Sequence, residues 1–71
     1  MNYYVKYKMY SVGEVKGVCA PAKSKEAAYE LAVYEIIKNK EGELPYCAWV
    51  DSVTYNNGRV HRFNTFEGNP Y

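Results

Sequence analysis

The sequence predicts an α+β fold, a two-layer ββαββ sandwich with one helix packed on a mainly antiparallel four-stranded sheet. Three observations predict it. Residues 3–10 alternate between apolar and polar side chains, residues 25–39 carry an apolar stripe at helical spacing, and an Asn-Gly pair separates two segments rich in β-favouring residues. The 71 residues leave room for a single domain, which we expect to span residues 1–64, followed by a flexible tail over 65–71.

The first strand is expected over Tyr3–Tyr10. Its inward positions are Tyr3, Val5, Tyr7 and Met9, and its outward positions are Tyr4, Lys6, Lys8 and Tyr10. A turn over residues 11–14, with a positive φ at Gly13, leads into a second strand over 15–20. Pro21 is expected to end that strand.

A helix is expected from Lys25 to Asn39, with Ser24 as its N-cap and Gly42 as its C-terminal stop. The residues expected to face the sheet are Ala28, Tyr29, Ala32, Val33 and Ile36. Tyr34 falls on the opposite face, so we expect its ring to be exposed.

A second hairpin is expected from a third strand over 46–55 and a fourth over 59–63. A type I′ turn at Asn57-Gly58 would place Thr54 opposite His61 and Val53 opposite Arg62. Both faces of this hairpin are partly apolar, so the sequence leaves open which of them packs on the helix. The sheet face away from the helix is expected to have no cover within the chain.

The charge of the chain is nearly balanced, with nine Lys and Arg against eight Asp and Glu. A net charge of +1 gives little general attraction to nucleic acid or to a membrane surface. No apolar run approaches the roughly 20 residues that a membrane-spanning helix needs. The N-terminal segment also lacks the continuous apolar core of a secretory signal, so we expect a cytoplasmic protein.

Two cysteines and one histidine are the residues most able to carry chemistry. Cys19, Cys47 and His61 are widely spaced and include no paired Cys-x-x-Cys motif, so they do not match a zinc site. We expect free thiols, because an intracellular chain usually keeps its cysteines reduced. No nucleophile–base pair or glycine-rich phosphate loop is present in the sequence. We therefore expect no enzymatic activity, no cofactor and no metal.

Nine tyrosines are more than a core of this size is expected to bury, and exposed tyrosines are typical of interfaces. The sequence therefore predicts a small non-enzymatic protein-binding module, which a homodimer would also satisfy. The expected partner-binding residues are Tyr4, Lys6, Lys8, Tyr10 and Tyr34. The alternative is a nucleic-acid-binding protein that uses the same aromatic and basic face. Its additional contacts would be Arg59, His61 and Arg62.

The order of a strand pair, a helix opening with Ser-Lys-Glu-Ala and an Asn-Gly hairpin resembles many short accessory proteins of bacteria, phages and mobile elements. The resemblance covers the pattern and includes no specific motif. A likeness of pattern assigns no function and identifies no partner, so a phage or mobile-element accessory or inhibitor protein is one form that the expected binding module could take.

Overall fold

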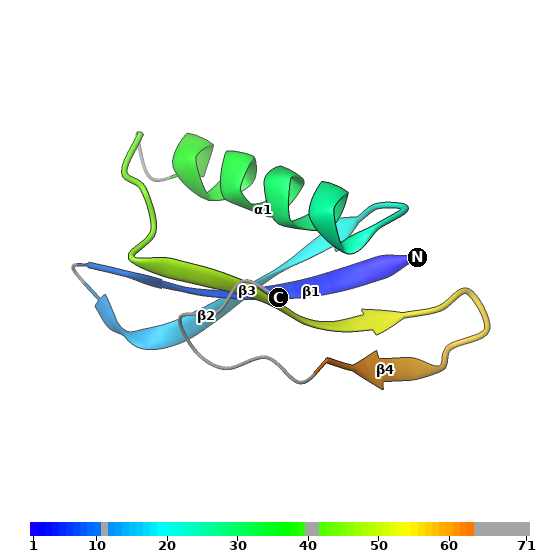
Figure 1. The fold of residues 1–71 in the computed structure, drawn as a ribbon. Coiled ribbons are helices and arrows are strands. Elements are labelled where there is room, and N and C mark those ends of the chain that lie inside the picture. The colour runs from blue at the N-terminus through cyan, green and yellow to red at the C-terminus, as the bar shows by residue number, and fades with distance from the viewer. Residues whose placement is uncertain (11, 40–41, 64–71) are drawn as a thin grey trace.

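The computed structural model describes residues 1–10, 12–39 and 42–63, and it places one helix on one face of an antiparallel four-stranded sheet (Figure 1). The elements are β1 (Asn2–Met9), β2 (Val12–Pro21), α1 (Lys25–Asn39), β3 (Cys47–Thr54) and β4 (Val60–Arg62). The predicted α+β fold and its ββαββ order are confirmed. The predicted domain end at residue 64 and the tail over 65–71 lie outside the described residues.

β1 is a central strand of the sheet, whose order is β2-β1-β3-β4. Val5 shows the central position of β1 best, because it lies opposite Val18 on β2 and opposite Val50 on β3. Val5 and Val50 are both fully buried. The predicted inward positions of β1 also hold, since Tyr3 and Met9 are buried as well. The alternation in the sequence therefore identified the core face of this strand.

α1 begins and ends at the predicted residues. At its start, the Oγ of Ser24 accepts a hydrogen bond from the backbone N–H of Ala27 at 3.2 Å, as an N-cap does. Beyond its end, Gly42 has a φ of 92°, and its N–H donates to the carbonyl of Ile37 at 2.8 Å. This is the left-handed glycine that commonly stops a helix.

The helix packs on the sheet through small side chains. Ala28 and Ala32 are fully buried and belong to the same core cluster as Val5 and Val50. Because an alanine extends only one carbon from the backbone, the helix lies close to the sheet along this line. A larger side chain at either alanine would push the two layers apart.

The predicted register of the second hairpin is wrong by one residue. Thr54 lies opposite Val60, and Val53 lies opposite His61. The turn contains three residues, 56–58, between Tyr55 and Arg59, and the Tyr55 N–H donates to the Arg59 carbonyl at 2.8 Å. Within the turn the Gly58 N–H donates to the Tyr55 carbonyl at 2.9 Å, and Gly58 has a φ of 88°, as in a three-residue hairpin turn closed by a left-handed glycine. A shift of one residue exchanges the two faces of a strand, which moves His61 to the helix side.

A bulge in β3 decides which apolar residues reach the core. Tyr4 lies opposite Ser52 and Val5 lies opposite Val50, so Asp51 has no partner on β1. The extra residue lets both Val50 and Val53 join the core cluster under the helix. Strict alternation along the sequence cannot place both of them on one face.

The same strand corrects the expectation that the far face of the sheet has no cover. Trp49 lies opposite Lys6, on the face away from α1, and its side chain is only 5% exposed. We call this the helix-free face. The centre of the helix-free face is not fully exposed to solvent, because the indole of Trp49 is buried there.

The first hairpin also differs from expectation at Gly13. This glycine lies within β2, and the positive φ angles of the described glycines belong to Gly42 and Gly58. β2 starts earlier than predicted and continues to Pro21. A proline is tolerated there because β2 is an edge strand, where an N–H is not required on the outer side.

Candidate functional site

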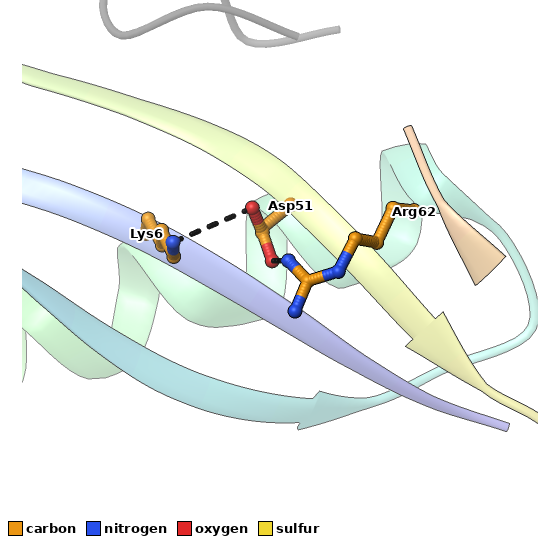
Figure 2. Close-up of polar contacts among 3 residues, drawn as sticks. All are labelled: Lys6, Asp51 and Arg62. Atoms are coloured by element: carbon orange, nitrogen blue, oxygen red, sulfur yellow. Dashed lines mark hydrogen bonds and ion pairs between the residues drawn. The ribbon is translucent and has the colours of Figure 1, made fainter. Parts of the chain in front are cut away.

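Three of the five predicted partner-binding residues lie together on the helix-free face. Tyr4, Lys6 and Lys8 alternate along β1 and face away from the buried side of the strand. Figure 2 shows Lys6 in front of the sheet, with α1 behind the strands. The prediction that these side chains share one face is therefore consistent with the structure.

The ring of Tyr4 does more than project from this face. It lies over Gly17 of β2, where a methyl group on the glycine would overlap the phenol ring. Gly17 is opposite Lys6, so the ring crosses diagonally from β1 to the edge strand. Tyr4 therefore fills the gap that the missing side chain of Gly17 leaves, and it remains 38% exposed.

An ionic group joins three strands across the helix-free face. The carboxylate of Asp51 lies between the Lys6 ammonium, at 3.5 Å, and the Arg62 guanidinium, at 3.4 Å (Figure 2). Asp51 is on β3, Lys6 on β1 and Arg62 on β4. Because the bulge frees Asp51 from a partner on β1, its side chain can serve both cations. Two of the basic residues expected to attract nucleic acid are thus bound to one carboxylate.

An exposed aromatic pair lies at one end of the sheet. Tyr10 directly follows β1 and Tyr46 directly precedes β3, so antiparallel pairing of the two strands brings them together. The ring centroids are 5.2 Å apart and the planes meet at 76°, an edge-to-face arrangement. The N–H of Tyr46 donates to the carbonyl of Lys8 at 2.7 Å, which fixes the backbone beneath the rings.

These two rings are among the most exposed apolar groups of the described residues, at 75% for Tyr10 and 61% for Tyr46. Beside them is a hollow of about 260 Å³, lined by Lys8, Met9, Tyr10, Gly13 and Tyr46. We call the two tyrosines and this hollow the aromatic corner. Its residues combine two exposed aromatic rings with a methionine, a glycine and one lysine.

The remaining predicted residues lie elsewhere. Tyr34 is 63% exposed, as predicted, but it is on α1, across the sheet from Tyr4 and Lys6. His61 is opposite Val53 on the helix side of β4, and its ring meets that of Phe63 edge-to-face at 5.2 Å. Arg59 directly follows the turn and precedes β4. Of the additional nucleic-acid contacts, only Arg62 reaches the helix-free face.

Phe63 gives His61 a structural environment. The Phe63 ring stacks on Tyr3 with centroids 6.4 Å apart, and the Lys25 ammonium lies 4.4 Å from the centroid of Phe63. His61 thus belongs to an aromatic cluster at the edge of the core. This arrangement gives His61 a packing role beside Phe63.

The cysteines are free thiols and are far apart. Cys19 lies opposite Tyr4 and Cys47 opposite Lys8, on either side of β1. Four residues along a strand and two strand spacings correspond to about 16 Å, whereas a disulfide needs Cα atoms within about 7 Å. Both cysteines lie opposite residues of the helix-free face and His61 is on the other face, so they do not form one site. Within the described ranges, no group of three or more His, Cys, Asp or Glu could hold a metal ion.

Comparisons with protein-family models, with curated proteins and with solved structures gave no match. Among the described residues, there is also no helix with the length and apolar character needed to cross a bilayer.

Sequence reasoning left Tyr46 unassigned and did not single out Asp51 or Trp49. Tyr46 could have been found from the position of Tyr10, because the two residues flank strands that pair antiparallel. Asp51 gave a weaker signal, an acidic residue inside an apolar strand. Trp49 required knowledge of the bulge that follows it.

Proposed function

We propose that this chain is a small non-enzymatic protein-binding module whose contact surface is centred on the aromatic corner. The observation that supports this most directly is the pair of exposed rings, Tyr10 and Tyr46, in mutual contact beside a hollow. Aromatic residues are enriched at the energetically dominant positions of protein interfaces. The surface extends along β1 to Lys8, which lines the same hollow.

The geometry also favours tight binding of a partner through these two rings. Each ring limits the rotation of the other, and the Tyr46 backbone is held to Lys8 by a hydrogen bond. Side chains that are already ordered lose less conformational entropy when a partner binds. The hollow can receive an apolar side chain of the partner, and the phenol hydroxyls can bond to its backbone.

Tyr4 and Lys6 have a mixed role in this proposal. Tyr4 packs on Gly17 and Lys6 pairs with Asp51, so both side chains support the fold as well as form the surface beside the corner. Tyr34 is a separate contact candidate, because it lies on α1 across the sheet. A single partner of ordinary size would contact one of these two regions.

Nucleic-acid binding remains the second candidate, and the ionic group speaks against it. Asp51 holds both Lys6 and Arg62, which lowers the positive potential of the face on which bases and phosphates would lie. His61 and Arg59 do not join that face. Lys8 is the only basic residue among those that line the hollow of the aromatic corner.

The order of elements in the sequence resembles that of short accessory proteins. An accessory or inhibitor protein of a phage or mobile element fits a short chain with one contact surface. Its partner is a protein, and a second copy of the chain is one such partner. The cytoplasmic location stays a prediction.

The test is affinity capture from host lysate with and without nuclease, using the wild-type chain and a Tyr10→Ser/Tyr46→Ser variant. We expect protein partners that are insensitive to nuclease and lost with the double variant. Tyr55→Ser is the matched control, because Tyr55 flanks the other end of β3 and is also exposed. Capture that survives the double variant, or that nuclease abolishes, would contradict the proposal.

A further inference from the structure

β2 offers a second surface, its open strand edge, which shares only Gly13 with the residues that line the hollow of the aromatic corner. It is an edge strand of ten residues, Val12–Pro21, whereas the edge strand on the other side, β4, has only three. A long edge presents a row of backbone N–H and C=O groups that another strand can pair with. The register with β1 also shifts after Lys16, so that residues 13–15 have no partner on β1.

The sequence of this edge is self-complementary. Residues 12–18 read Val-Gly-Glu-Val-Lys-Gly-Val, which is the same in both directions except that Glu14 and Lys16 exchange places. If two copies of β2 pair antiparallel about Val15, each Glu14 lies opposite the Lys16 of the other copy. Like residues meet at the other positions: Val15 with Val15, Gly13 with Gly17, and Val12 with Val18.

We infer that the chain forms a homodimer by antiparallel pairing of two β2 strands, centred on Val15. The pairing joins two four-stranded sheets into one eight-stranded sheet with both helices on the same face. Opposite charges at directly opposed positions stabilise an antiparallel pair. By the two-fold symmetry, the Glu14–Lys16 pair occurs twice.

The charges also select one register. Moving the partner strand by two residues in either direction places Glu14 opposite Glu14 or Lys16 opposite Lys16, which is repulsive. A shift by one residue puts side chains of opposite faces in register. A lysine on an edge strand normally discourages pairing, and here the glutamate two residues away makes pairing specific for a second copy.

Exposure and charge at these residues are consistent with the dimer. Glu14 is exposed, Val15 is 43% exposed, and Lys16 is partly exposed. The ion pairs found in the described part of the chain involve Lys6, Asp51 and Arg62, not Glu14 or Lys16. The two glycines suit the contact as well. Tyr4 covers Gly17, and a side chain at Gly13 would meet nothing within 4 Å, which leaves room there for the Tyr4 ring of the other copy.

The experiment is sedimentation equilibrium on the full chain over a wide concentration range. The wild-type protein should approach twice the 8.2 kDa mass of the chain. Glu14→Lys and Lys16→Glu should each weaken dimerisation roughly ten- to thirtyfold, since two pairs turn from attractive to repulsive. Mixing the two single variants should restore the dimer, because a heterodimer of them again has opposite charges at both pairs. The double variant E14K/K16E should also dimerise.

Controls separate this contact from general charge effects and from the aromatic corner. Glu30→Lys and Lys23→Glu make the same charge changes at exposed positions outside β2 and should leave the dimer unchanged. The Tyr10→Ser/Tyr46→Ser variant should lose the captured partner and keep the dimer. Loss of partner capture therefore tests the proposed function, and loss of the dimer tests the β2 pairing. A wild-type chain that stays at 8.2 kDa up to millimolar concentration would overturn the inference. A dimer that survives both single charge reversals would overturn it too.

Discussion

The phenol ring of Tyr4 occupies the space over Gly17 that a side chain would otherwise fill. The two residues are on neighbouring strands and are offset diagonally, since Gly17 is opposite Lys6. An aromatic ring over an edge glycine covers backbone that would otherwise be open to water. The tyrosine and the glycine therefore act as one packing unit.

This packing unit predicts that the effect of Gly17→Ala on stability depends on whether Tyr4 is present. In the wild-type background we expect a loss of about 1 kcal/mol, because the new methyl group displaces the ring. In a Tyr4→Ala background the same change should raise stability by roughly 0.5 kcal/mol, because alanine suits a strand better than glycine. Urea unfolding of the four proteins measures the coupling. An equal effect of Gly17→Ala in both backgrounds would show that the ring and the glycine are independent.

Asp51→Asn tests the ionic group. It leaves Lys6 and Arg62 without their carboxylate, and we expect a loss of up to about 1 kcal/mol, since the Asp51 side chain is still 18% exposed. The loss should shrink with added salt, because salt screens such pairs. Glu30→Gln, at an exposed helix position, is the control and should change little at any salt concentration.

The same variant distinguishes the two function classes. A nucleic-acid binder should bind single-stranded DNA or RNA more tightly as Asp51→Asn, because the face becomes more positive. A protein-binding module that uses the aromatic corner should show no such gain. Titration at low ionic strength measures this directly.

Much of the fold could be predicted where local chemistry decides it. Ser24 and Gly42 mark the ends of α1 through hydrogen bonds within a few residues, and the alternation of β1 identifies its buried face. The hairpin register and the β3 bulge depend on how many residues the turn and strand accommodate. An Asn-Gly pair fits both a two-residue and a three-residue turn, and the sequence alone favoured the former.

Trp49→Ala should be among the most damaging single changes. The indole is buried on the helix-free face, and removing a buried tryptophan side chain costs about 3–5 kcal/mol. That is comparable with the total stability of a small domain, so much of the variant should be unfolded by circular dichroism. Tyr34→Ala, which removes an exposed ring from α1, should stay within about 0.5 kcal/mol of wild type. A folded Trp49→Ala protein of normal stability would contradict the assigned burial.

Gly58→Ala should destabilise the second hairpin. The φ of 88° at Gly58 is in the left-handed region, which costs an alanine roughly 1–2 kcal/mol. Gly13→Ala is the matched control, because Gly13 is in a strand and has open space around its α-carbon. In thermal unfolding of dilute samples, only Gly58→Ala should lower the midpoint.

The candidate site was predictable in part, for a related reason. The outward face of β1 follows from alternation, and Tyr10 was correctly expected to be exposed. Its contact with Tyr46 joins residues that are 36 positions apart and depends on the β1–β3 register. The pairing of Asp51 with two cations depends on the bulge. Contacts between distant residues need the strand order and register, which local patterns do not contain.

Trp49 is the only tryptophan of the chain, and this gives the molecule an internal optical probe. Its indole is shielded from water on the face that carries Lys6 and the ionic group. Its emission should therefore lie at short wavelength in the native protein and move to longer wavelength when that face opens. The unfolding of this face can therefore be followed in real time, with no label attached to the chain.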